Sequence, residues 1–254
     1  MVWFAASCQF NGATSSGATD GATIDGMTLD GTADDGAVDD ALTNANGLIS
    51  INVGHNGPLD PSEPSGIQGV TNWNDLTGIA NATTSDLVDS LGAPATGMTF
   101  AITGGNDSFN HLSTPDKRMI SGWVRDATVN ITGIPYSTYD VIIYYDSWAQ
   151  VSNQNNSIAE YAFSSGGGAI TSVWGVNQKD FRLGPEDPHD YDEFMATSLA
   201  EAQAQGTGSD SGDGDGGYHL IVTGLTASEL DIVATTVEGT PASICAIQIR
   251  GAAN

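Results

Sequence analysis

The segment YDVIIYYDS at residues 139–147 decides the fold that the sequence predicts. Successive side chains of a strand point to opposite faces, and in this segment both faces carry large apolar residues. A strand of that kind is buried on both sides, so we expect it at the centre of a sheet. The core of the protein should be deepest around it.

Further strand-like runs lie on both sides of this central segment, and Gly, Asn, Pro, Ser or Asp punctuates nearly every gap between them. Helical periodicity is almost absent. One short stretch, residues 85–91, is compatible with a helical turn. Residues 192–205 fit either a short helix or an edge strand followed by a loop. Many short strands joined by turns predict an all-β, jelly-roll-like β-sandwich. The other strand-like runs are residues 48–54, 98–105, 119–124, 127–134, 159–164, 169–176, 218–225, 230–237 and 244–251.

The N-terminal part of the chain does not share this pattern. From Asp20 to Asp40 an Asp-Gly step recurs every five residues, a spacing that matches neither a helix nor a strand. Glycine loses much backbone entropy when it is fixed, and neighbouring aspartates repel each other, so this stretch cannot form a core alone. We therefore expect an extended arm at residues 1–47, followed by the sandwich domain at 48–254.

Charge and composition exclude several classes of partner. Among 254 residues, 6 are Lys or Arg and 31 are Asp or Glu, which gives a net charge of −25. Binding to nucleic acid or to anionic lipid requires basic side chains that neutralise phosphates, so we expect neither partner. No run approaches the ~20 apolar residues that span a bilayer, so we expect no membrane insertion. Strong acidity with few lysines and abundant Gly, Thr, Ser and Asn favours an extracellular or cell-surface protein.

The arm begins with an apolar tip, MVWFAASCQF (residues 1–10), whose strand-forming anchors are Val2, Trp3, Phe4 and Phe10. Such a segment gains main-chain hydrogen bonds and buried surface when it adds to the open edge of a sheet. Burial of the four anchors would contribute roughly 6–12 kcal/mol before ordering costs. Because donor and acceptor surfaces differ, insertion into a neighbouring copy is head-to-tail and extends into a filament. The tip could instead fold back as an edge strand of its own domain, or be the remainder of a signal peptide.

The two cysteines, Cys8 and Cys245, lie near opposite ends of the chain. In an oxidising environment this pair predicts a disulfide, either within one chain or between neighbouring copies, where it would lock an inserted strand. Two alternatives remain open. Both thiols could stay reduced, or Cys8 could be lipidated, since Ala5-Ala6-Ser7-Cys8 weakly resembles a lipoprotein cleavage box.

Two acidic segments are candidates for cation binding. In GTGSDSGDGDGG, Asp210, Asp213 and Asp215 could supply the oxygen ligands that Ca²⁺ needs, although a solvated loop explains the composition as well. The segment GPEDPHDYDEF at residues 184–194 could also hold a cation, or supply the two carboxylates of a glycoside hydrolase, about 5–10 Å apart. An acidic surface loop is the plainer interpretation. We expect no enzyme activity, because no Gly-x-Ser-x-Gly, His-Glu-x-x-His or Cys-x-x-Cys motif is present.

Glycans are the remaining class of expected partner. Trp148 or Trp174 could stack on a sugar, although tryptophans of β-sandwiches lie more often in the core or at its rim. The alternative function is therefore a secreted carbohydrate-binding module that uses calcium. Threonines of the arm and four Asn-x-Ser/Thr sequons are candidate sites for attached sugars. These candidates are Thr14, Thr19, Thr23, Thr28, Thr32, Asn81, Asn106, Asn130 and Asn155.

Five short motifs carry a resemblance to a known family. They are INVG (51–54), NWND (72–75), YDVIIYY (139–145), TGL (223–225) and AIQI (246–249). Over about residues 48–251 the chain resembles the extracellular jelly-roll domain proteins of environmental bacteria, of planctomycete and verrucomicrobial type. The resemblance implies a jelly-roll sandwich and supplies no catalytic residues. The arm is similar to that of subunits of glycan-coated extracellular filaments, in which an N-terminal strand links each β-sandwich to the next. This similarity of the arm implies a structural homopolymer.

Overall fold

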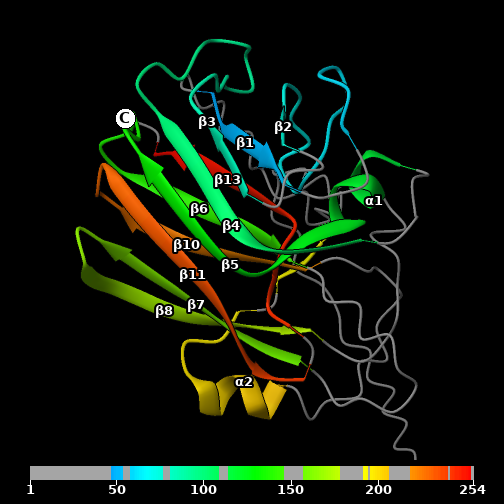
Figure 1. The fold of residues 1–254 in the computed structure, drawn as a ribbon, viewed down its shortest axis with the longest axis vertical. Coiled ribbons are helices and arrows are strands. Elements are labelled where there is room, and N and C mark those ends of the chain that lie inside the picture. Colours follow the sequence, from blue (N-terminus) through cyan, green and yellow to red (C-terminus); the bar gives the residue numbers. More distant parts are fainter. Residues whose placement is uncertain are drawn as a thin grey trace, which may run out of the picture. The chain divides into compact units, whose positions relative to one another are not determined.

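The computed structural model describes residues 47–53, 58–76, 81–108, 114–145, 157–177, 191–193, 195–205, 218–239 and 241–252. Within these residues two β-sheets pack face to face as a β-sandwich (Figure 1). The expected all-β class is confirmed. The predicted arm lies outside the described residues, apart from Gly47.

The first sheet has the strand order β2–β1–β13–β6–β10–β9. Strand β6, the predicted central strand, pairs antiparallel with β13 on one side and β10 on the other. The short edge strands β2 and β9 run parallel to their neighbours. In sheet order, the strands span Asn74–Asp75, Ile49–Asn52, Ala246–Gly251, Tyr139–Tyr145, Tyr218–Leu225 and Asp192–Glu193.

The second sheet has the order β3–β4–β5–β11–β7–β8, and β12 (Ser243–Ile244) also pairs with β5. All of its pairings are antiparallel. After β5 the chain crosses repeatedly between the two sheets, as in a jelly roll, although β7 and β8 pair within the second sheet and β9 and β10 within the first. In sheet order, the strands span Asn81–Thr84, Thr99–Ser108, Gly122–Thr132, Glu229–Glu238, Ser157–Ser165 and Gly168–Asn177.

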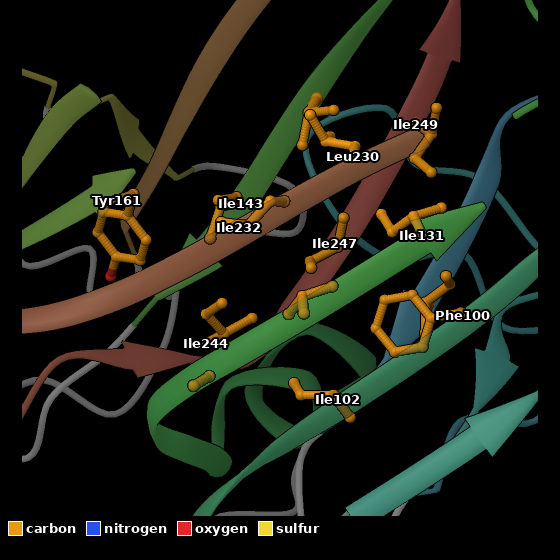
Figure 2. Close-up of a cluster of buried hydrophobic side chains, with 14 of the residues drawn as sticks. Phe100, Ile102, Ile131, Ile143, Tyr161, Leu230, Ile232, Ile244, Ile247 and Ile249 are labelled. Carbon is orange, nitrogen blue, oxygen red and sulfur yellow. The ribbon is translucent and has the colours of Figure 1, made fainter. Parts of the chain in front are cut away.

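The main core fills the space between the two sheets. Strand alternation explains which residues enter it: in β5, Val129 and Ile131 are buried, whereas Thr128 and Asn130 face solvent. Figure 2 shows the same arrangement in the neighbouring strands, whose buried side chains meet between the layers. The labelled side chains are Phe100, Ile102, Ile131, Ile143, Tyr161, Leu230, Ile232, Ile244, Ile247 and Ile249.

A second apolar cluster covers the opposite face of β6. Val141, Ile143 and Tyr145 belong to the main core, whereas Ile142 and Tyr144 belong to this second cluster, together with residues of the 59–73 loop and of helix α1 (Pro115–Ile120). Both faces of β6 are therefore buried, as the sequence predicts.

Two local predictions are wrong. The expected strand at 119–124 is instead the end of helix α1 and the start of β5, which continues unbroken to Thr132. The Thr114 side chain accepts a hydrogen bond from the Lys117 N–H and Pro115 occupies the first turn, so this segment carries an ordinary helix start. Residues 85–91 form no helix; Val88 makes an isolated bridge with Pro94.

Residues 192–205 contain both of the expected alternatives, strand β9 followed by helix α2 (Leu199–Gln205). Neither α1 nor α2, the two helices within the described ranges, has the length and apolar character to cross a membrane.

Candidate assembly edge

Strand β8 is a long edge strand of unusual composition. It ends the second sheet, and its ten residues, GAITSVWGVN, include neither a charged residue nor a proline. Natural edge strands usually carry lysine or proline, or stay short, because an open row of N–H and C=O groups recruits other chains. The other edge strands of the described sandwich have two to four residues.

The described residues cover only one half of the open side of β8. Trp174 exchanges two backbone hydrogen bonds with Ala196, at 2.9 and 2.8 Å. Val176 packs with Ala196 and with Ala202 of α2 in a small apolar cluster. The half from Gly168 to Val173 pairs with β7 on one side and has no strand on the other side among the described residues.

Backbone alternation identifies the groups that the open half presents. In an antiparallel ladder, every second residue directs its N–H and C=O away from a given neighbour. Trp174 uses these groups on Ala196, so Ser172, two residues earlier, directs its own toward the same open side. Ile170 is an extra residue at the register shift of the β7–β8 pairing, and its side chain is 41% exposed. Among the described residues, edge β8 therefore offers hydrogen-bonding groups without partners beside an exposed apolar side chain.

The base of the arm and edge β8 lie on opposite sides of the sandwich. Gly47 precedes β1, and Leu48 exchanges hydrogen bonds with Ser90 in the β3–β4 connection. Strand β8 lies at the other end of its sheet and contacts β10 across the core. Figure 1 shows this separation of β1 from β8. An arm that leaves the sandwich on one side and an acceptor strand, β8, on the other side suit a head-to-tail contact between copies.

Of the two predicted disulfide cysteines, the structure describes Cys245. Its side chain is fully buried in the second cluster, where the thiol lies 3.9 Å from the carbonyl oxygen of Ile120. A bridge to Cys8, which lies outside the described residues, would require this cluster to open. The disulfide stays a prediction.

The predicted anchors and the predicted calcium ligands also lie outside the described residues. This applies to Val2, Trp3, Phe4 and Phe10, to the arm threonines, and to Asp210, Asp213 and Asp215. Within the described ranges, no group of three or more His, Cys, Asp or Glu side chains is arranged to hold a metal ion. Calcium binding stays a prediction.

The structure describes three of the four sequons. Asn81 is exposed at the start of β3. Asn130 is exposed near the end of β5, where its side-chain amide donates to Asp231 at 2.7 Å. Asn106 is half-buried in β4, and Asn155 lies outside the described residues. Asn81 and Asn130 are therefore both exposed, and the Asn130 amide is engaged with Asp231.

Two of the tryptophans lie in the core, as is usual in β-sandwiches. Trp73 and Trp123 are 4% exposed in the second cluster. Trp174, a proposed sugar-stacking residue, is half-buried on β8, and Trp148 lies outside the described residues.

A buried polar network around Asp116 was not expected from the sequence. Asp116 is 2% exposed, and its Oδ1 accepts hydrogen bonds from the Ser65 hydroxyl (2.9 Å), the Gly66 N–H (2.7 Å) and the Tyr191 hydroxyl (2.8 Å). Burial, reinforced by the charge of Asp116, raises the pKa of Tyr191 well above its usual range. The tyrosine therefore remains a neutral donor.

A second set of buried hydrogen bonds connects the same loop to the first sheet. The Tyr144 hydroxyl accepts from the Ile67 N–H at 2.9 Å and donates to the Gln248 side-chain oxygen at 2.6 Å. The Gln248 amide in turn donates to the Ser50 hydroxyl at 2.9 Å. Since these groups are buried and mutually satisfied, we assign them to anchoring the 59–73 loop and helix α1, not to chemistry.

No protein-family model matches the chain, and no curated protein matches it. Among solved structures, the chain is similar to Bacteroides uniformis β-glucuronidase 2 covalently bound to cyclophellitol-6-carboxylate aziridine, with a TM-score of 0.38 and 12% identity over 84% of this chain and 18% of that one. A calcium binding mutant of the same enzyme has a TM-score of 0.38 and 11% sequence identity, over 84% of this chain and 19% of that one. The chain thus spans about a fifth of these enzymes, and likeness at this level carries no argument about function.

Proposed function

We propose that the protein is a non-enzymatic structural subunit of an extracellular, head-to-tail homopolymeric filament. Residues 1–10 of one copy add as a strand to edge β8 of the next. The observation that carries this proposal is the open half of β8, which has no charge and no proline to prevent pairing. The acidic, lysine-poor composition supports an extracellular location, and the exposed Asn81 supports a glycan on the subunit surface.

The length of the arm is sufficient for this contact. About 37 residues separate the apolar tip from β1, and an extended chain of that length reaches up to about 125 Å. Addition of the tip would supply the hydrogen-bonding partners that Ser172 lacks among the described residues and would cover the exposed side chain of Ile170.

Deletion of residues 1–10 is expected to abolish fibre formation, because it removes the donor strand and leaves the sandwich intact. Negative-stain micrographs of concentrated full-length protein should show fibres, and micrographs of the deletion variant should show single particles. The matched control deletes residues 11–20, which shortens the tether by the same amount but keeps the tip; the remaining ~27 residues still reach about 90 Å. Single particles in the full-length sample would overturn the proposed function.

A charge placed on edge β8 should block assembly without unfolding the protein. The variant Ile170→Lys introduces at the edge the residue that natural edge strands use against pairing. The matched control is Val233→Lys on β11, an inner strand of the same sheet, where the side chain is comparably exposed, 37% against 41%. We expect fibres from the control and none from Ile170→Lys, with equal circular dichroism spectra. Fibres from both variants would place the acceptor elsewhere on the subunit.

A further inference from the structure

A pocket of about 710 Å³ lies at the end of the sandwich where the described chain begins and ends. The β3–β4 connection (89–96) and the β5–β6 connection (135–138) form its walls, and Gly47 and Ala252 complete it. Sites for small molecules typically measure about 300–1,000 Å³. The pocket therefore has the size of a small-molecule site, and it is separate from edge β8.

The wall around Asp89 is held in shape by hydrogen bonds. The Asp89 Oδ1 accepts from the N–H groups of Leu91 (2.9 Å) and Ala93 (2.8 Å), and the Asp89 N–H donates to the Ala93 carbonyl at 2.8 Å. Asn72 donates its side-chain amide to the carbonyl of Ser90 at 2.9 Å. These contacts form the pocket before any ligand arrives.

Tyr136 forms the opposite wall. Its hydroxyl donates to the Gly47 carbonyl, and its ring lies against Gly251 so closely that a Cβ on that glycine would stand 2.5 Å from the ring. Burial, with a smaller contribution from the charge of Asp89, raises the pKa of Tyr136 to about 12. The ring is thus a fixed, neutral aromatic surface at physiological pH.

The remaining lining groups define the chemistry of a ligand. Thr96, Ser137 and Thr138 contribute hydroxyls, and Asp89 contributes Oδ2; the hydrogen bonds within the described residues leave these groups unused. The aliphatic part of the lining includes Leu91, Pro94 and Pro135, and no described lining residue is basic. A hydroxyl-rich ligand with an apolar face fits this lining, because its hydroxyls find partners and its C–H groups find an aromatic surface. The carboxylate and the net charge of −25 disfavour anions.

We propose that this pocket binds a neutral saccharide of one or two hexose units. Asp89 and the three hydroxyls bond to the hydroxyls of the sugar, and the exposed part of the Tyr136 ring contacts its C–H groups. The proposal does not depend on filament formation. The saccharide in the pocket differs in chemistry from the apolar strand that adds to β8.

The test titrates the full-length protein with neutral methyl hexosides and disaccharides, and with glucuronic acid as the anionic probe, followed by NMR. We expect at least one neutral sugar to shift the amide signals of the 89–96 and 135–138 segments with a Kd of about 1 mM or below, and glucuronic acid to bind at least about tenfold more weakly. Asp89→Asn keeps Oδ1, which the turn needs, and removes the charge. This variant should therefore reduce the difference in affinity between neutral sugars and glucuronic acid. Equal binding of glucuronic acid and of neutral sugars by the unmodified protein would overturn the proposal.

Variants then locate the site. Thr96→Trp places a large side chain at the rim of the pocket and should weaken binding at least about tenfold, whereas Thr103→Trp, at a position that is also exposed but lies on β4 outside the pocket, should not. Deleting residues 1–10 should leave the affinity unchanged. An increase in affinity on deletion would mean that the apolar tip occupies the pocket, and would contradict the proposal, as would saturation of no neutral sugar or undiminished binding by Thr96→Trp.

Discussion

Replacement of Asp116 by alanine is expected to lower the free energy of unfolding by at least about 3 kcal/mol. The substitution leaves three buried donors, from Ser65, Gly66 and Tyr191, without their common acceptor. Each buried donor that loses its partner costs about 1–3 kcal/mol. Urea denaturation followed by tryptophan fluorescence measures the change, and Trp73 and Trp123 in the same cluster report on it directly.

Two control variants separate the lost acceptor from other effects of changing Asp116. Asp116→Asn retains the Oδ1 that receives all three hydrogen bonds and should cost only about 1 kcal/mol. Asp231→Ala removes a carboxylate whose described partner is the exposed Asn130, and should change stability by less than about 1 kcal/mol. If Asp116→Ala and Asp116→Asn lowered stability equally, the network would not act through its acceptor.

Substitution of Gly133 by alanine is the second change with a large expected effect, a loss of at least about 3 kcal/mol. Gly133 joins β5 to the β5–β6 connection with a φ of +69°, in the left-handed region that L-residues disfavour. A Cβ at this position would also overlap the backbone carbonyl oxygen of Gly97, which cannot rotate away as a side chain can.

A matched glycine isolates the overlap from the backbone strain. Gly224 has nearly the same φ, +73°, but a Cβ there would have no atom within 4 Å. Gly224→Ala should therefore cost only the left-handed conformation, about 1–2 kcal/mol. The difference between the two variants in urea denaturation measures the clash, and equal losses would mean that the 97–98 and 133 segments separate without cost.

Local patterns were sufficient to predict the class of fold. The apolar residues on both faces of residues 139–145 correctly identified β6 as a central strand, and the alternation in 218–225 and 230–237 matched β10 and β11 closely. Helix α1 was missed because its apolar end, Met119 and Ile120, runs directly into the strand that follows. The signal that could have found it was the capping threonine followed by proline at 114–115.

Neither the edge position of β8 nor the burial of Asp116 could be predicted from local sequence patterns. The sequence of β8 resembles that of an inner strand, and its position at the edge depends on the order of strands in the sheet, which is a property of the whole fold. Asp116 follows Pro115 in the first turn of α1, where an aspartate ordinarily faces solvent. Its burial depends on Ser65 and Tyr191, which are 51 and 75 residues away along the chain.

Gly47 and Ala252 line the same pocket, so the backbone enters and leaves the sandwich at neighbouring points. A linker of a few residues could join these points and produce a circular permutant, with new termini in the Gly166–Gly167 turn, where both glycines face open space. By the same geometry, the 47–252 unit could be grafted into a surface loop of an unrelated host protein without separating the two ends of that loop.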